Sequence, residues 1–218
     1  MSPDDIGTAG APTGESGNKG PAGVEFTEDW TTNKLDLWLP VLAEMRDEPT
    51  DILEAGTFEG RSAIALLDYM PKSRITCIDH FKDADVEGRF DRNMAAYGDR
   101  VTKRKGSAVV IMEQLRRKHA SYDLIYLDCA KERTGAFIVS ALGWHMLKVG
   151  GIIIWDDLNW QKTRNPARRA EPGSKLFIKT FWRSMKVLHH PVSNPRWSGQ
   201  LIARKVSDDW PDYELPDM

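Results

Sequence analysis

A glycine turn and one acidic residue are the first features of this sequence with a clear chemical use. Glu54, Gly56 and Gly60 lie in the turn after the first predicted strand, and Asp79 ends the second predicted strand. In a parallel α/β sheet, ligands bind beyond the carboxyl ends of the strands, so the turn and the acid face one crevice. A carboxylate there accepts hydrogen bonds from both hydroxyls of a ribose. We therefore predict a nucleoside ligand; the alternative is a tight turn beside a solvated acid.

The spacing of this turn argues against ligands that are held through a pyrophosphate. In the dinucleotide fingerprint G-x-G-x-x-G, the middle glycine lets the pyrophosphate approach the backbone, but here Phe58 stands at that position. A Walker loop needs Gly-Lys-Ser/Thr, whereas this chain has Gly60-Arg61-Ser62 after a shorter loop. The ligand that remains is a nucleoside without a pyrophosphate.

Short apolar runs alternate with helical patterns along the chain, and these elements must position the turn and the acid. We predict strands at 51–55, 74–79, 101–105, 122–128, 150–155, 185–191 and 197–206. We predict helices at 30–45, 60–69, 87–97, 107–119, 134–147 and 174–184. Strands that alternate with helices form a parallel, doubly wound sheet. The predicted fold class is α/β and Rossmann-like, with a mostly parallel seven-stranded sheet and a terminal antiparallel hairpin.

Composition and charge limit the kind of protein. Hydrophobic residues make up 41% of the 218 residues and charged residues 28%, as in ordinary globular proteins. The net charge of −2 gives no electrostatic reason to expect nucleic acid or an anionic membrane as partner. No apolar run approaches the roughly 20 residues that span a bilayer, and no secretory signal is visible. The two cysteines, Cys77 and Cys129, exclude a disulfide scaffold and favour a cytoplasmic location.

The chain divides into three segments by composition. Residues 1–23 are rich in Gly and Pro and lack aromatic residues, so we predict a disordered tail. Residues 24–206 form the predicted folded domain. Residues 207–218 form an acidic C-terminal segment.

These motifs resemble those of class I S-adenosylmethionine-dependent methyltransferases over about residues 24–206. The motifs that carry the resemblance are the Glu54-x-Gly56-x-x-x-Gly60 turn, Asp79, Gly106-Ser107 and Gly150-Gly151. The resemblance implies that Gly56 and Thr57 lie against the methionine part of the cofactor and that Asp79 holds the ribose. It also implies that His80 and Ser107 flank the adenine. The implied cofactor-binding residues are Glu54, Gly56, Thr57, Gly60, Ser62, Asp79, His80, Ser107 and Asp128.

Three carboxylates follow the fourth and fifth predicted strands, and they suggest a metal site. Asp128 ends one strand, and Asp156 and Asp157 end the other. Carboxylates in one cleft repel each other unless a cation neutralises them, and Mg²⁺ prefers such oxygen ligands. Lys131 lies three residues after Asp128, within reach of a metal-bound hydroxyl, so we predict that it is the general base. The arrangement is similar to the catechol O-methyltransferase branch, although Asp157 replaces the usual Asn of that branch.

The predicted activity is transfer of a methyl group from S-adenosylmethionine to a hydroxyl of a small molecule, assisted by Mg²⁺ or another divalent cation. Asp128-Cys129-Ala130-Lys131 lacks the Asn/Asp-Pro-Pro-aromatic motif of amino-base methyltransferases. The alternatives are a metal-independent methyltransferase of sugars or secondary metabolites and a non-catalytic cofactor-binding domain. Asp157 as a helix cap and Lys131 as a surface lysine are the structural alternatives for those residues. The oligomeric state, with a homo-oligomer among the options, stays open.

A basic stretch and three tryptophans are further candidates for substrate contacts. Residues 161–173 follow the fifth predicted strand and carry four basic residues, so they are either a substrate lid or a solvated loop. Trp155, Trp160 and Trp182 are candidates for an aromatic wall, with core packing as the alternative for Trp155 and Trp182.

Overall fold

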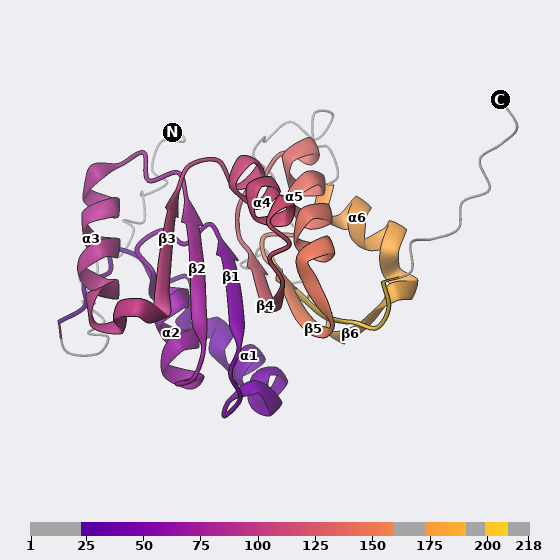
Figure 1. Cartoon of the computed structure of the whole chain (residues 1–218), viewed down its shortest axis with the longest axis horizontal. Helices are drawn as coiled ribbons and strands as arrows, with labels where there is room; N and C mark the ends of the chain where they lie inside the picture. Colours follow the sequence, from indigo (N-terminus) through magenta and orange to yellow (C-terminus); the bar gives the residue numbers. More distant parts are fainter. Residues whose placement is uncertain (1–22, 159–172, 191–198, 209–218) are drawn as a thin grey trace, which may run out of the picture.

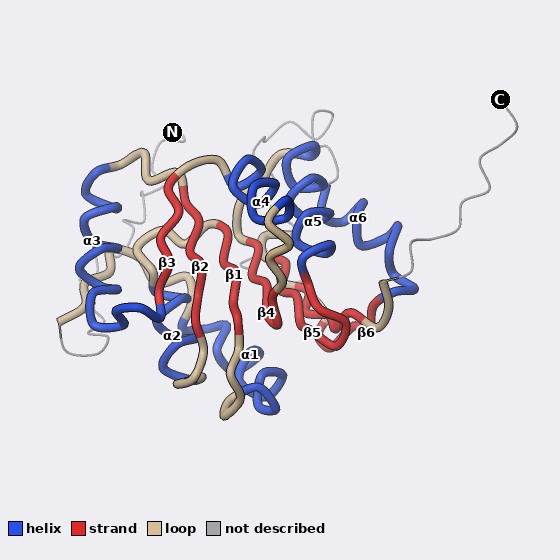
Figure 2. The backbone as a smooth tube through the Cα atoms, viewed as in Figure 1, coloured by secondary structure: helices blue, strands red, loops and turns tan. Residues whose placement is uncertain are grey.

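One central sheet organises the part of the chain that the computed structural model describes, residues 23–158, 173–190 and 199–208. Its seven strands lie in the order β3-β2-β1-β4-β5-β7-β6 (Figures 1 and 2). The strands are β1 (Asp51–Ala55), β2 (Arg74–Asp79), β3 (Val101–Lys105), β4 (Tyr122–Leu127), β5 (Leu147–Trp155), β6 (Met185–His189) and β7 (Leu201–Lys205). β1 to β5 are parallel, and β7 runs antiparallel between β5 and β6. The predicted fold class is confirmed.

Helices cover both faces of the sheet and create two apolar cores (Figure 1). They are α1 (Leu35–Leu42), α2 (Arg61–Tyr69), α3 (Ala84–Met94), α4 (Ala108–Arg117), α5 (Arg133–Met146) and α6 (Gly173–Phe181). α1 to α3 bury Trp38 and Phe90 on one face, and α4 to α6 bury Trp144 and Phe177 on the other. Because the central strands face both cores, their side chains are buried on both sides, as the run Ile152–Trp155 shows.

The segment predicted as one helix over 30–45 is interrupted in the structure. A 3-10 turn, Thr32–Lys34, precedes α1, and a second one, Ala43–Met45, follows it. Pro40 lies inside α1, and proline removes a backbone donor and crowds the preceding turn, so the helix stays short. Residues 24–34, which we call the strap, therefore enter the fold ahead of α1 instead of forming its first turns.

The helix predicted at 87–97 begins earlier because of its cap. α3 starts at Ala84, directly after Asp83, whose side chain accepts a hydrogen bond from the backbone N–H of Asp85 at 2.8 Å. The chain continues in a 3-10 segment, Ala95–Arg100, which leads into β3. The remaining differences at strand ends are small. β4 ends at Leu127, β5 begins at Leu147, β6 ends at His189 and β7 spans Leu201–Lys205.

Backbone hydrogen bonds hold the loops at the carboxyl ends of the central strands at one level. The N–H of Asp128, after β4, donates to the carbonyl of Ala55 in β1 at 2.8 Å. The N–H of Asp156, after β5, donates to the carbonyl of Leu127 in β4 at 2.9 Å. The residues that follow β1, β4 and β5 therefore meet along one edge of the sheet, where parallel α/β proteins bind ligands.

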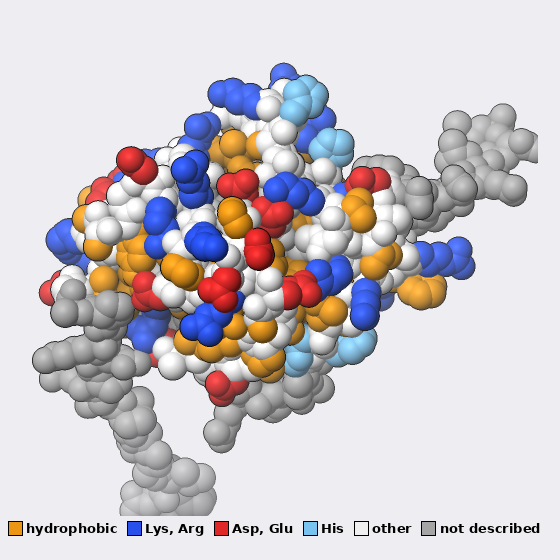
Figure 3. Space-filling model, turned by 60° about the horizontal axis from the view of Figure 1, so that its bottom comes forward, with side chains coloured by type: hydrophobic (Ala, Val, Ile, Leu, Met, Phe, Trp, Pro, Cys, Tyr) orange, Lys and Arg blue, Asp and Glu red, His pale blue; other side chains and the backbone are white. Residues whose placement is uncertain are grey.

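Some predictions concern residues outside the described ranges. These are most of the tail 1–23, most of the basic stretch 161–173, Trp160, and most of the acidic segment 207–218, so those predictions remain predictions. Among the described helices, none is both long and apolar enough to cross a bilayer. On the face shown in Figure 3, acidic and basic side chains are interspersed.

Candidate functional site

The glycine turn after β1 lies against the loop after β4. Gly56 has φ +94°, and a Cβ built on it would lie 2.7 Å from the carbonyl carbon of Asp128 and closer still to the oxygen. Gly60 has φ +85° and would place a Cβ 2.9 Å from the sulfur of Met94. Only glycine combines the left-handed conformation with these close approaches. The turn is therefore built to bring the β1 backbone next to the β4 loop.

Glu54 stabilises this turn from the protein interior and does not face the crevice. Its carboxylate is fully buried and accepts hydrogen bonds from the hydroxyls of Thr57, at 2.6 Å, and Ser62. Burial raises the pKa of Glu54 to about 7, although these two hydrogen bonds lower it in part. All three are among the residues predicted to bind the cofactor. The structure brings them together, but the Glu54 carboxylate is turned toward the protein interior.

Asp79, at the end of β2, organises the loops on either side of it. Its Oδ2 accepts a hydrogen bond from the N–H of Phe58 at 3.0 Å, and its Oδ1 accepts one from the N–H of Phe81 at 3.1 Å. The carboxylate is partly exposed, so it remains accessible to a ribose. His80 next to it is exposed. Ser107 precedes α4, and its hydroxyl makes no capping hydrogen bond to that helix.

Backbone strain collects at this edge of the sheet. The described residues include five non-glycine positions with positive φ. Four of them lie in the loops after β1, β2, β4 and β5, namely Phe58, Phe81, Ala130 and Asp157. Such conformations cost free energy and persist where the surrounding structure requires them, often at binding sites. This distribution supports the placement of the functional site at the carboxyl ends of the strands.

Asp128, Asp156 and Asp157, which we call the carboxylate cluster, do not all share one partner. The ammonium of Lys131 lies between Asp128 Oδ1 and Asp157 Oδ2 and contacts both. Burial opposes the charge on Lys131, but the two carboxylates outweigh it and raise the lysine pKa to about 12. Burial and the charge of Asp156 raise the pKa of Asp128 to about 6, although Lys131 lowers it in part.

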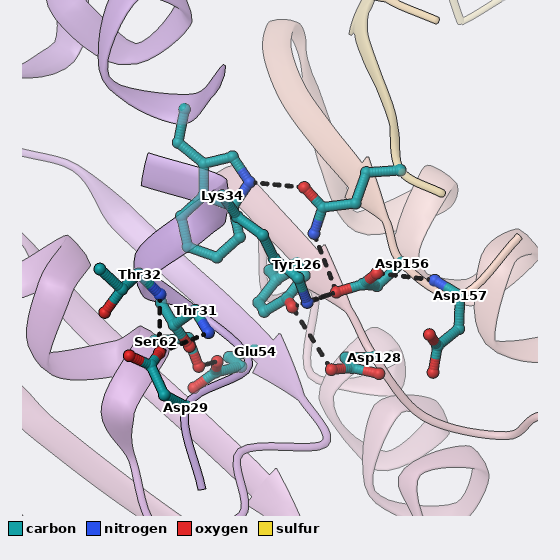
Figure 4. Close-up of polar contacts among 12 residues, drawn as sticks. Asp29, Thr31, Thr32, Lys34, Glu54, Ser62, Tyr126, Asp128, Asp156 and Asp157 are labelled. Atoms are coloured by element: carbon teal, nitrogen blue, oxygen red, sulfur yellow. Dashed lines mark hydrogen bonds and ion pairs between the residues drawn. The ribbon is translucent and has the colours of Figure 1, made fainter. Parts of the chain in front are cut away.

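Asp156 has a different set of partners, none of which the sequence indicated. Its Oδ2 accepts hydrogen bonds from Lys34, from the Tyr126 hydroxyl at 2.6 Å and from Gln200 at 2.8 Å (Figure 4). Burial alone would raise the pKa of Asp156, but Lys34 and the other donors hold it below its ordinary value. The Tyr126 hydroxyl also lies 3.3 Å from Asp128, so it links two members of the carboxylate cluster.

The donor chemistry of the cluster suits a hard divalent cation, but the three carboxylates are not gathered around one point. Among the described residues, no three His, Cys, Asp or Glu side chains are arranged to hold a metal ion. Asp128 and Asp157 already hold one positive group between them, the Lys131 ammonium. Mg²⁺ is commonly held by one or two carboxylates, with water and substrate oxygens at its other positions. Asp128 and Asp157 fit that pattern, and the predicted third ligand, Asp156, faces Lys34.

Two small cavities border the carboxylate cluster. The first lies between the strap and the glycine turn and is lined by Phe26, Glu28, Trp30, Thr31, Lys34, Gly56, Thr57, Phe58, Glu59, Arg61, Ser62, Tyr126 and Asp128. The second lies toward α5 and α6, and Lys131, Trp155, Asp156 and Asp157 are among its lining residues. Trp155 is buried, as in the core-packing alternative, whereas Trp182 is exposed. A small cavity thus lies on each side of the carboxylate cluster.

The strap closes one side of the first cavity through polar contacts with the glycine turn. Thr27 donates from its N–H and its hydroxyl to Glu59, at 2.7 and 2.8 Å. Asp29 pairs with Arg61 at 2.8 Å. The ring of Trp30, which is 54% exposed, lies 5.1 Å from that of Phe58. No local sequence pattern indicates these contacts, because each joins residues about 30 positions apart.

Comparisons with known proteins find a methyltransferase domain within this chain. Residues 53–158 match the model of a family described as "Methyltransferase domain". The curated O-methyltransferase hkm8 of Aspergillus hancockii is 30% identical over 124 residues, which are 55% of this chain and 47% of that protein. The chain therefore spans about half the length of this curated relative.

Solved structures share the fold. An O-methyltransferase from Bacillus cereus, crystallised with S-adenosylhomocysteine, has a TM-score of 0.65 and 18% identity, covering 82% of this chain and 83% of its own. The MycE methyltransferase of mycinamycin biosynthesis, crystallised with Mg, S-adenosylhomocysteine and mycinamycin VI, has a TM-score of 0.61 and 13% identity, covering 88% of this chain and 54% of its own. The family match identifies residues 53–158 as a methyltransferase domain, and the sheet order and the glycine turn agree with that assignment.

Proposed function

We propose that this protein transfers the methyl group of S-adenosylmethionine to a hydroxyl of a small molecule. The observation that carries the proposal is the close approach of Gly56 to Asp128, which joins the cofactor turn to the carboxylate cluster. A cofactor seated on the turn has its reactive end beside these carboxylates. Methyl transfer breaks the bond between carbon and the sulfonium sulfur, forms a bond to the acceptor oxygen and releases S-adenosylhomocysteine. The hydroxyl proton must pass to a base.

Within this proposal, Asp79 binds the ribose, and Gly56 and Thr57 contact the methionine part of the cofactor. Glu54 and Ser62 act indirectly, because they hold Thr57 and the turn in place. We assign His80 and Ser107 to the adenine side, since His80 is exposed beside Asp79 and the Ser107 hydroxyl makes no capping bond to α4. The O-methyltransferase relative supports an oxygen acceptor, and the MycE structure with mycinamycin VI supports a small molecule as its carrier.

The carboxylate cluster is the proposed site for Mg²⁺ or another divalent cation. Asp128 and Asp157 supply hard oxygen ligands, and Asp156 is the third candidate. A bound divalent cation would acidify a coordinated hydroxyl. Lys131 lies at the same place, in contact with two of the carboxylates, and is the proposed base. The crystallisation of MycE with Mg adds support by analogy of fold.

One observation favours a metal-independent version of the same reaction. The Lys131 ammonium already occupies the position between Asp128 and Asp157, so the chain supplies its own cation there. In this second candidate, Lys131 neutralises the carboxylates, and positioning of the two substrates supplies most of the rate.

Cofactor binding and methyl transfer test the proposal in sequence. We expect calorimetry to show one S-adenosylhomocysteine bound per chain, and Asp79→Ala to weaken binding at least about tenfold, because two ribose hydroxyls lose their acceptor. Labelled S-adenosylmethionine is then incubated with pools of hydroxylated small molecules, with and without EDTA. Loss of label transfer in EDTA supports the cation, and retained transfer supports the metal-independent version. Absence of cofactor binding would remove the proposal.

A further inference from the structure

Asp156 is the member of the carboxylate cluster that faces the strap. Its side chain is only 1% exposed, and both oxygens have donors. Oδ1 accepts a hydrogen bond from the N–H of Asp157 at 2.7 Å. Oδ2 accepts three hydrogen bonds, from Lys34, Tyr126 and Gln200. Oδ2 therefore has no free lone pair, and a cation can bind this oxygen only where one of its three donors leaves.

Of the three donors to Oδ2, Lys34 is the one that a bound cation would displace. Its ammonium and a divalent cation on the same oxygen would repel each other, whereas the Tyr126 hydroxyl and the Gln200 amide are neutral. Tyr126 also has a second acceptor close by, since its hydroxyl lies 3.3 Å from Asp128. Gln200 is fixed by Trp38, whose indole N–H donates to its side-chain oxygen at 2.9 Å.

We propose that Lys34 and a divalent cation are alternative partners of Asp156, so that Lys34 sets the cation affinity of the carboxylate cluster. The inference rests on the proposed function, because it takes the cluster as a cation site. With Lys34 in place, Asp128 and Asp157 are the carboxylates that remain for a cation. Without Lys34, Asp156 no longer pairs with the strap and is available as a third ligand of the cation. Lys34 is thus a positioning residue and not a catalytic one.

The same contact ties the cluster to the strap. Lys34 ends the strap and lies directly before α1, and its side chain lines the first cavity beside Gly56. If a cation displaces Lys34, the strap loses one attachment and keeps those of Thr27 and Asp29 to the glycine turn. Thermodynamic linkage is reciprocal, so the cation loosens the strap by the same free energy by which Lys34 weakens cation binding.

The first test measures Mn²⁺ binding to the full chain by electron paramagnetic resonance. We expect Lys34→Met to raise the Mn²⁺ affinity by about tenfold, within the usual range of coupling between two sites. Lys34→Arg keeps the charge and should leave the affinity near that of the wild type. Lys148→Met is the matched control, because Lys148 pairs with Asp123 at 2.9 Å at the opposite ends of β4 and β5. It removes one lysine from an Asp pair without touching the cluster.

Two further measurements separate a direct contact from a general charge effect. In an Asp156→Asn background, Lys34→Met should no longer change the Mn²⁺ affinity. The neutral amide of Asn does not carry the negative charge for which Lys34 and the cation compete. In the wild type, Mg²⁺ should speed hydrogen exchange of the strap amides, whereas in Lys34→Met the strap should exchange fast with or without Mg²⁺.

An unchanged or lower Mn²⁺ affinity in Lys34→Met would overturn the inference, and so would an equal rise in the Asp156→Asn background. Absence of Mn²⁺ binding in every variant would overturn it as well. S-adenosylhomocysteine binding, measured on the same samples, shows separately whether the proposed cofactor site stands. Circular dichroism of each variant confirms that it is folded.

Discussion

Glu54 places an ionisable group where no solvent reaches it, and this has a consequence for stability. Its pKa is about 7 in the folded protein because of burial, against an ordinary value of 4.5. Between these pH values, the folded state holds a proton that the unfolded state has lost. The contribution of Glu54 to the free energy of unfolding therefore falls as the pH rises from about 4.5 to about 7, by about 3 kcal/mol.

Glu54→Gln removes this titration, so we expect the variant to gain stability relative to the wild type as the pH rises through that window. Urea unfolding between pH 4 and pH 8 measures the difference. Glu48→Gln, at an exposed glutamate, is the control for loss of a carboxylate. Stability curves of Glu54→Gln and wild type that stay parallel across the window would contradict the prediction.

Lys131 has two proposed roles that one pair of substitutions separates. A general base must give up its proton, yet Asp128 and Asp157 hold the ammonium and raise its pKa. We expect Lys131→Ala to lower kcat by roughly 10²–10⁴-fold with little change in cofactor affinity. Lys131→Arg keeps the charge but does not act as a base, since arginine stays protonated. Turnover of the Arg variant near that of wild type would exclude the base role and favour neutralisation of the cluster.

Local sequence motifs predict some of the site residues. They do not predict the residues that are distant in sequence from their partners in the site. Asp79 ends a strand, Asp128 and Asp157 follow strands, and the rule that ligands bind at strand ends predicts all three. Lys34 and Gln200 reach Asp156 across 122 and 44 positions. No local spacing encodes such contacts, because they depend on how α1 and β7 pack beside β5.

At the scale of elements, the turn after β1 depends on the absence of a side chain at Gly56. Gly56→Ala should destabilise the protein by more than about 2 kcal/mol, since it combines positive φ with a clash against the Asp128 backbone. Gly150→Ala is the matched control, because Gly150 also has positive φ, +88°, but an added Cβ meets nothing within 4 Å. Denaturant midpoints compare the two variants. Equal losses would show that conformation alone, and not the close approach, requires Gly56.

The predicted ends of helices and strands agree with the structure where a single local sequence signal determines them. β1, β2 and β3 begin and end at the predicted residues, since each is a short run bounded by turns. The first helix did not, because the apolar period of 30–45 continues through Pro40 and hides the interruption. α3 began earlier than predicted, because its cap, Asp83, precedes the first apolar position of the helix.

At the scale of the molecule, the two cores share the strands of one sheet. Ile125 of β4 belongs to the core beneath α4 to α6, and its neighbour Leu124 belongs to the core beneath α1 to α3. Neither layer of helices can unfold alone without exposing apolar side chains of these strands to water. We therefore expect one cooperative thermal transition, seen at the same temperature by far-UV and near-UV circular dichroism.

The cofactor should shift that single transition as a whole, because its proposed site spans the loops after β1, β2 and β4. At a ligand concentration of about 100 times Kd, binding to the folded state alone adds about 2.7 kcal/mol. For a chain of this size, that raises Tm by roughly 5–10 °C. Asp79→Ala should lose most of the shift at the same S-adenosylhomocysteine concentration, while Lys148→Met keeps it. Two separate transitions, of which the cofactor moves only one, would mean that the layers unfold independently and that the site belongs to one of them.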